Sequence, residues 1–286
     1  MKIHNPLTSD IQSETNPSLP ALNWVGMSQI ESSMLVDDLM IPCQLDIGVN
    51  LRPGFRGIHM SRLYQLHLEY FLRKNLDEKQ VELFLSESLK SQEQTSSEVS
   101  VKIEFQLPTK TVSLKSELAG YRNYPVQIIF ERTPQMNRWI SFEILYSSTC
   151  PQSAGLSVEA LRDVGLTVDR LPATPHAQRS RARIKLQLKE FSIGLIRQLI
   201  AGVENQLGTP VQTSVKRADE MEFARLNAQN LMFCEDAVRS ISDFLQKNSG
   251  VLGFSVFCEH FESLHSHNAS CLKKHHWTGP EFLHFS

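Results

Sequence analysis

Apolar and polar residues alternate along several stretches of the chain, which is the pattern of a strand with one buried face. Residues 43–51 (CQLDIGVNL) alternate in this way and stop at Arg52-Pro53-Gly54, which predicts a strand closed by a turn. The same alternation, or a content rich in β-branched and aromatic residues, predicts further strands. These are expected at residues 22–30, 99–107, 121–130, 139–146 and 182–191 and in the apolar run at 250–260.

A different spacing, close to that of a helix, separates these strands. Leu63, Leu66 and Tyr70 recur at helical intervals, and Asp77 is placed to cap a second helix that carries Val81. In the second half, Ser192 precedes a helix over 193–207 that Gly208 ends, and a later helix includes Asp236. Residues 151–175 contain Gly and Pro with only a short helix at 158–161, which predicts a long excursion between two strands.

The order of these elements repeats. Each half reads strand, strand, helix, helix, strand, strand, although the halves share no visible sequence identity. We therefore expect two related α+β units in one chain. The expected boundaries are an N-terminal arm at 1–40, a first unit at 41–135, a second unit at 136–270 that carries most of the active site, and a C-terminal tail at 271–286.

Composition narrows the function classes. The chain has 286 residues, 41% of them hydrophobic, and a formal net charge of −2, which gives no overall field for holding nucleic acid or an anionic membrane. No apolar run is long enough to span a bilayer, and the first residues lack the features of a signal peptide. We therefore expect a cytoplasmic protein with a small-molecule partner.

The five cysteines are odd in number and scattered, which favours reduced thiols over a disulfide framework. The stretch 261–267 (FESLHSH) places Glu262, His265 and His267 directly after an apolar run. Imidazoles carry protons near neutral pH and also bind metals. This stretch is therefore either part of a site or a chance cluster.

Four more reactive side chains lie next to turns or helix starts. Cys150 ends a strand before Pro151, where a thiolate would be accessible, although a buried structural cysteine is the alternative. His176 is either a ligand or an exposed loop histidine. Glu220 and Glu235 are either functional or solvated carboxylates in first turns of helices, where the helix dipole favours negative charge.

Several short runs, taken in order, resemble the type IB GTP cyclohydrolases of bacteria and archaea. Each run is weak alone, but most of them contain a reactive residue and together they span nearly the whole chain. The runs are Asp10–Ser13, Gly57–Arg62, Cys150-Pro151, His176–Ser180, Lys216–Glu220, Asn230–Asp236 and Phe261–His267.

The resemblance implies a tunnelling fold, in which an antiparallel four-stranded sheet carries a pair of helices and is duplicated within the chain. It also implies a homotetramer with active sites at subunit interfaces. The implied reaction is hydrolysis of GTP to 7,8-dihydroneopterin triphosphate and formate, which leads to tetrahydrofolate and also serves deazapurine pathways. A divalent metal is implied as well, with zinc or manganese as the first choices and iron as a further one.

By the same resemblance, Cys150, His176 and Glu220 are the metal ligands, and Cys150 is essential to catalysis. A thiolate, an imidazole and a carboxylate leave open positions at which a bound water can ionise. His265 and His267 are expected to move protons, and Glu262 to orient one of them. Glu235 is expected to anchor the guanine through two parallel hydrogen bonds, although the division of roles between Glu235 and Glu262 stays open.

Phosphate binding is assigned to local sets of cations and donors. His59, Ser61 and Arg62 lie at an expected helix start, where backbone N–H groups favour anions. A solvated surface is the alternative for all of these residues, and a structural turn is the alternative for Gln178. The further members assigned to substrate binding are Gln178, Arg179 and Lys216, with Arg181 and Arg217 nearby.

The chain departs from the family pattern in three places. Gln152 stands where many members have a second cysteine, the interval from Cys150 to His176 is long, and the tail after His267 has no counterpart. Two other functions are therefore kept. One is a tunnelling-fold nitrile reductase with a cysteine nucleophile and NADPH. The other is a non-catalytic relative that binds purine or metal.

Overall fold

The computed structural model describes residues 14–164 and 173–280. Within these ranges the chain forms eight strands and six helices. The strands are β1 (Leu22–Val36), β2 (Leu39–Leu51), β3 (Val99–Val112), β4 (Ala119–Thr133), β5 (Gln135–Thr149), β6 (Ala177–Leu188), β7 (Val251–His260) and β8 (Ala269–His275). The helices are α1 (Met60–Tyr70), α2 (Glu78–Ser91), α3 (Pro151–Val164), α4 (Ile193–Leu207), α5 (Arg217–Gln229) and α6 (Cys234–Gln246).

The eight strands form one sheet in the order β1-β2-β3-β4-β5-β6-β7-β8. The prediction of a tunnelling fold built from two four-stranded sheets, each with its own helix pair, is therefore wrong. Alternation of apolar residues shows which face of a strand is buried, but it does not show which strands exchange hydrogen bonds. Here each strand pairs with its neighbours in sequence, so no boundary between two sheets exists along the series.

Contacts between residues nevertheless divide the chain into two compact units. Unit 1 comprises Met1–Gln106, Gln127–Trp139 and Glu190–Ile193, and unit 2 comprises Leu107–Val126, Ile140–Lys189 and Gly194–Ser286. Strands β3, β4 and β5 each contribute residues to both units. The units are thus discontinuous in sequence, and each is described by itself below.

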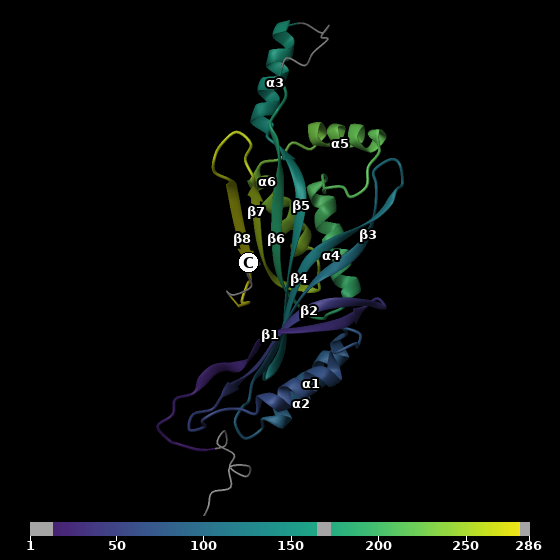
Figure 1. Ribbon diagram of the computed structural model, residues 1–286. Coiled ribbons are helices and arrows are strands. Elements are labelled where there is room, and N and C mark those ends of the chain that lie inside the picture. Colours follow the sequence, from purple (N-terminus) through teal and green to yellow (C-terminus); the bar gives the residue numbers. More distant parts are fainter. Residues whose placement is uncertain (1–13, 165–172, 281–286) are drawn as a thin grey trace, which may run out of the picture. The chain divides into compact units, whose positions relative to one another are not determined.

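In unit 1, α1 and α2 lie side by side next to the sheet (Figure 1). The predicted cap of α2 is confirmed, because the Asp77 carboxylate accepts a hydrogen bond of 2.9 Å from the Gln80 N–H. Val81, Phe84 and Leu85 of this helix are fully buried. Phe84 packs against Phe71, with ring centroids 4.7 Å apart.

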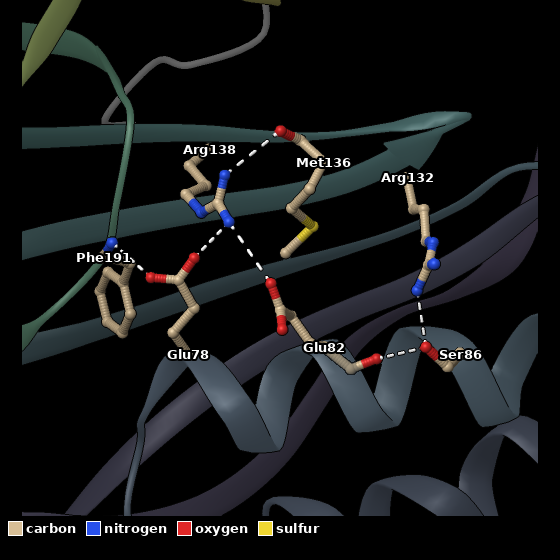
Figure 2. Close-up of polar contacts among 7 residues, drawn as sticks. All are labelled: Glu78, Glu82, Ser86, Arg132, Met136, Arg138 and Phe191. Atoms are coloured by element: carbon tan, nitrogen blue, oxygen red, sulfur yellow. Dashed lines mark hydrogen bonds and ion pairs between the residues drawn. The ribbon is translucent and has the colours of Figure 1, made fainter.

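Charged side chains also connect α2 to the sheet in unit 1. Figure 2 shows Arg138 of β5 between the carboxylates of Glu78 and Glu82, and it pairs with both. Glu78 additionally accepts a hydrogen bond of 2.7 Å from the Phe191 N–H. Arg132 of β4 donates to the Ser86 hydroxyl over 2.6 Å. We call Glu78, Glu82, Ser86, Arg132 and Arg138, together with the Phe191 N–H, the unit 1 polar cluster.

In unit 2, α6 packs against β7 and β8. Helix α4 contacts α6 closely, because a Cβ added at Gly202 would lie 2.1 Å from the Phe244 ring. Gly208 ends α4 as predicted, with φ at +72° and its N–H donating to the Glu204 carbonyl over 2.9 Å. None of the helices in the described part of the chain is long and apolar enough to cross a membrane.

Three segments have longer elements than the sequence analysis expected. The strand predicted at 22–30, within the arm, extends over residues 22–36 as β1, and residues 271–275, placed in the tail, complete β8. The expected excursion after Cys150 begins with the full helix α3, which has no buried residue among its described positions. An edge strand and an exposed helix bury little apolar surface, so their periodicity is weak in the sequence.

Candidate active site

A cavity of about 430 Å³ opens in unit 2 where β5 and β7 end and where β6, α3 and α6 begin. Five residues that the sequence analysis named as ligands, catalytic groups or anchors line it together. They are Cys150, His176, Glu235, Glu262 and His265. Gln178, named for substrate binding, lines it as well. The fold thus gathers in one place reactive residues that are far apart in sequence.

Cys150 and His176 are adjacent because they lie at the matching ends of neighbouring strands. The Cys150 N–H donates to the His176 carbonyl over 3.2 Å. Cys150 is half-buried and carries a free thiol, directly before the first turn of α3. A sulfur and an imidazole therefore reach the cavity from the same end of the sheet.

The His176 ring has two acceptors near one nitrogen. Its Nδ1 lies 3.0 Å from Oε1 of Gln178 and 3.8 Å from Oε2 of Glu262. The Nε2 atom has no hydrogen-bond partner within the described ranges. Glu262 follows β7, where the Phe261 N–H donates to the Arg179 carbonyl over 3.1 Å. That bond holds the beginning of the 261–267 stretch against β6.

Glu235 lies in the first turn of α6, as predicted, and its side chain reaches the cavity. The N-terminal end of a helix favours a carboxylate, which keeps an acceptor available for a substrate. The residue before it, Cys234, is buried, and its thiol contacts the Cys258 carbonyl over 3.1 Å. Burial raises the pKa of the Cys234 thiol to about 12, so this cysteine is inert next to the more accessible Cys150.

His265 and His267 lie in the exposed loop between β7 and β8. Their rings stack with centroids 5.0 Å apart and an angle of 11° between the planes. His265 lines the cavity, whereas His267 is not a lining residue and stacks on His265. The two imidazoles are therefore neighbours, as two groups that exchange protons with one substrate would be.

Glu220, named as the third metal ligand, does not line the cavity. It lies exposed in the first turn of α5, beside the buried Asp219. The Ser116 hydroxyl donates a hydrogen bond to Asp219, and the backbone N–H groups of Lys115, Ser116 and Lys216 donate three more; these bonds lower the pKa of the Asp219 carboxyl. Within the Lys216–Glu220 run, Asp219 is thus the structural residue, and Lys216 is the exposed N-cap residue of α5.

Two side chains in the cavity are suited to bind a divalent metal, but they do not form a complete metal site by themselves. A thiolate from Cys150 and the unpartnered Nε2 of His176 are a suitable pair for zinc and for several other divalent ions. Within residues 14–164 and 173–280, however, no three His, Cys, Asp or Glu side chains are close enough together to hold an ion. A complete site therefore needs a third donor that the single described chain does not place beside the other two.

The residues named for phosphate binding lie partly in unit 1. His59 and Arg62 line a separate cavity of about 250 Å³ in that unit, and Ser61 is exposed at the start of α1. Arg62 donates to the Ser91 carbonyl at the end of α2 over 2.8 Å, and the His59 N–H donates to Gln92. In unit 2, Arg179 is an exposed residue of β6. The motif at Asp10–Ser13 falls outside the described residues.

Sequence reasoning missed His260, the last residue of β7. It lines the cavity although only 3% of its surface is exposed, and its Nε2 lies 2.9 Å from the hydroxyl of the buried Tyr146. Burial lowers the pKa of His260 to about 4, so the ring is neutral near pH 7. The only signal in the sequence was its position at the end of an apolar run next to Phe261.

The cavity is lined by a thiol, imidazoles and carboxylates. These groups are typical of a site that binds a polar molecule and moves protons. The thiol and the imidazoles are also suited to bind a metal. Comparison with known proteins supplies the family. The sequence profile described as "Type I GTP cyclohydrolase folE2" matches residues 8–271. The chain belongs to this family, which confirms the GTP cyclohydrolase family and activity predicted from the short motifs.

Two relatives agree with this assignment, and a solved structure shares the fold. Proteins described as "GTP cyclohydrolase FolE2" from Bdellovibrio bacteriovorus and Pseudoalteromonas atlantica are each 37% identical to this chain. The matches cover 91% of this chain and 93% and 94% of those proteins. A uricase from Arthrobacter globiformis superposes with a TM-score of 0.51 over 92% of this chain and 96% of the uricase. At 7% identity, this last likeness concerns the fold alone.

Proposed function

We propose that the unit 2 cavity is the active site at which this GTP cyclohydrolase converts GTP and water to 7,8-dihydroneopterin triphosphate and formate, the first step toward tetrahydrofolate. The observation that carries the proposal is the gathering of Cys150, His176, Glu235, Glu262 and His265 around one cavity. Family membership gives the reaction, and this cavity gives it a location with the groups that the reaction needs.

Glu235 would hold the guanine. An ionised carboxylate accepts two parallel hydrogen bonds, and guanine offers N1–H and the 2-amino group side by side. The exposed carboxylate of Glu235 lies at the first turn of α6 with no arginine or lysine partner in the described part of the chain. It can therefore give both oxygens to the base.

His265, His267 and Glu262 would handle the protons. Attack of water at the purine C8, opening of the ring and departure of formate each need a proton moved by a positioned side chain. The stacked pair His265 and His267 supplies two imidazoles beside the cavity. Glu262 lies beside His176 and is placed to orient its ring.

Cys150 and His176 would hold the divalent metal, with Glu220 as the predicted third ligand. A metal bound there would make a coordinated water acidic enough to ionise near neutral pH. Glu220 is exposed on α5, so it is available to a site shared between subunits, as the predicted homotetramer with interface active sites would provide. Zinc, manganese and iron all suit a thiolate, imidazole and carboxylate set.

The triphosphate would bind to cations outside the cavity proper. Arg179 and Lys216 are exposed in unit 2, and His59, Ser61 and Arg62 belong to unit 1. These assignments depend on the subunit arrangement. A homotetramer and a cytoplasmic location complete the proposal, and both are predictions.

The test is formate release from GTP by the purified protein with added manganese or zinc, followed by oxidation of the product to a fluorescent pterin. Cys150→Ala should abolish both signals and lower the bound metal. Cys271→Ala is the matched control, because Cys271 is also half-buried in unit 2 but does not line the cavity. Full activity in Cys150→Ala would overturn the location.

The same assay separates the two alternative functions. Consumption of NADPH with a deazapurine nitrile and without metal would favour the reductase. Stoichiometric binding of GTP without any formate would favour a binding protein. Glu220→Gln completes the set, because unchanged metal content in this variant would remove Glu220 from the ligands.

A further inference from the structure

The amide of Gln178 is occupied at both ends by the protein itself. Its Nε2 donates to the Ser148 hydroxyl over 2.8 Å, and its Oε1 lies 3.0 Å from Nδ1 of His176. The side chain is 8% exposed. A buried amide with both ends engaged has little left to offer a substrate. The structure therefore points away from the substrate-binding role that the motif suggested for Gln178.

Behind Gln178 the hydrogen bonds continue into the core. Ser148 and Ser180 are fully buried, and their hydroxyls lie 2.7 Å apart on neighbouring strands β5 and β6. The polar atoms Ser180 Oγ, Ser148 Oγ, Gln178 and His176 Nδ1 thus form one chain that ends at the cavity. Fixing an amide at its far end fixes which atom it turns toward the imidazole.

Two oxygens face the same nitrogen of His176. Besides Oε1 of Gln178, the Glu262 carboxylate approaches Nδ1 to 3.8 Å. An amide oxygen and an ionised carboxylate can only accept hydrogen bonds. Both therefore favour the hydrogen on Nδ1, which leaves the lone pair on Nε2.

We propose that Gln178 is a positioning residue that holds His176 in the Nδ1–H tautomer, so that Nε2 presents its lone pair to the divalent metal. The inference rests on the proposed function for the role of the metal, but not for the tautomer itself. Partners of this kind are general in metal sites, where loss of the outer hydrogen bond weakens metal binding about 10- to 100-fold.

The test compares Gln178→Leu and Gln178→Glu with Gln187→Leu. Gln187 is a residue of the same strand that accepts a hydrogen bond from Thr278 and does not line the cavity. Gln178→Leu should weaken manganese or zinc binding about 10- to 100-fold, as measured by calorimetry. Gln178→Glu keeps an acceptor toward Nδ1 and should lose less, and Gln187→Leu should bind like the wild type. Equal affinity in Gln178→Leu and wild type would overturn the proposal.

A second readout needs neither metal nor activity. Nitrogen-15 NMR of the metal-free wild-type protein, at a pH where the imidazole is neutral, should show His176 with its hydrogen on Nδ1. Gln178→Leu, or Ser148→Ala if the leucine variant does not fold, should shift the ring toward the Nε2–H form. A wild-type His176 in the Nε2–H form would refute the inference. If the wild-type protein has His176 in the Nδ1–H form but does not bind the metal, only the proposed metal site is refuted.

Discussion

The unit 1 polar cluster and the unit 2 cavity both contain carboxylates beside the sheet, but these carboxylates differ in whether a cation pairs with them. In unit 1, Glu78 and Glu82 share the Arg138 guanidinium, and Glu78 accepts a backbone hydrogen bond as well (Figure 2). In the cavity, Glu262 has only an imidazole at 3.8 Å, and Glu235 has no lysine or arginine partner within the described residues. Removing one partner of a buried charge pair destabilises the fold, whereas carboxylates without a cation are available for chemistry.

The largest effect expected from this comparison is on turnover. Glu262→Gln removes a negative charge and an acceptor from the cavity, and loss of a group that positions or moves protons lowers kcat/KM by about 10²- to 10⁴-fold. Glu82→Gln changes a carboxylate in the same way within the unit 1 polar cluster, and it should leave kcat/KM within a few-fold of the wild type. Formate release per folded protein measures both.

If both variants lost activity equally, the contrast between the two regions would be wrong. Circular dichroism of each variant must first show the wild-type spectrum, so that the lost activity reflects chemistry. If Glu262→Gln kept full activity with its fold intact, Glu262 would belong with the structural carboxylates.

The next largest effect is the pH dependence of the free energy of unfolding that comes from His260, a buried residue that lines the cavity. Burial lowers the pKa of His260 from 6.5 to about 4, so the unfolded chain binds a proton at a higher pH than the folded chain does. This contribution to stability is fully present above pH 6.5 and is lost as the pH falls toward 4. The loss is up to about 3 kcal/mol, since one pKa unit corresponds to about 1.4 kcal/mol.

Urea unfolding of the wild type and His260→Gln across this pH range measures the effect. The variant lacks the imidazole, so its free energy of unfolding should change less with pH than that of the wild type. Other groups titrate in both proteins and cancel in the difference. Parallel pH profiles for the two proteins would show that His260 is not the source.

Local parts of this organisation could be predicted from the sequence. Asp77 and Gly208 mark helix ends through chemistry within a few residues, and both predictions are confirmed. The cavity residues Cys150, His176 and Glu235 each follow or precede a predicted element, so the motifs found them. What joins Cys150 to His176 is the pairing of β5 with β6, which alternation along a single strand cannot specify.

The rest depended on tertiary context. The single sheet follows from pairing between strands that have equally good apolar faces, and sequence pattern could not decide between one sheet and two. His260 looked like the end of an ordinary buried strand, since nothing near it in sequence indicates Tyr146 as its partner. Glu220 and Asp219 are adjacent, and only the fold shows that Asp219 is the buried one.

The smallest effect tests the paired side of the comparison. Arg138→Met leaves the carboxylates of Glu78 and Glu82 without their cation in a place where the guanidinium is 13% exposed. Removing one partner of a buried ion pair destabilises by about 3–5 kcal/mol, and the 51% exposure of Glu82 reduces this to about 2 kcal/mol in unfolding free energy. Arg132→Met removes one hydrogen bond to the neutral Ser86 and should cost about 1 kcal/mol or less. Urea unfolding at neutral pH ranks the two. Equal losses would mean that the carboxylates of unit 1 gain nothing from being paired.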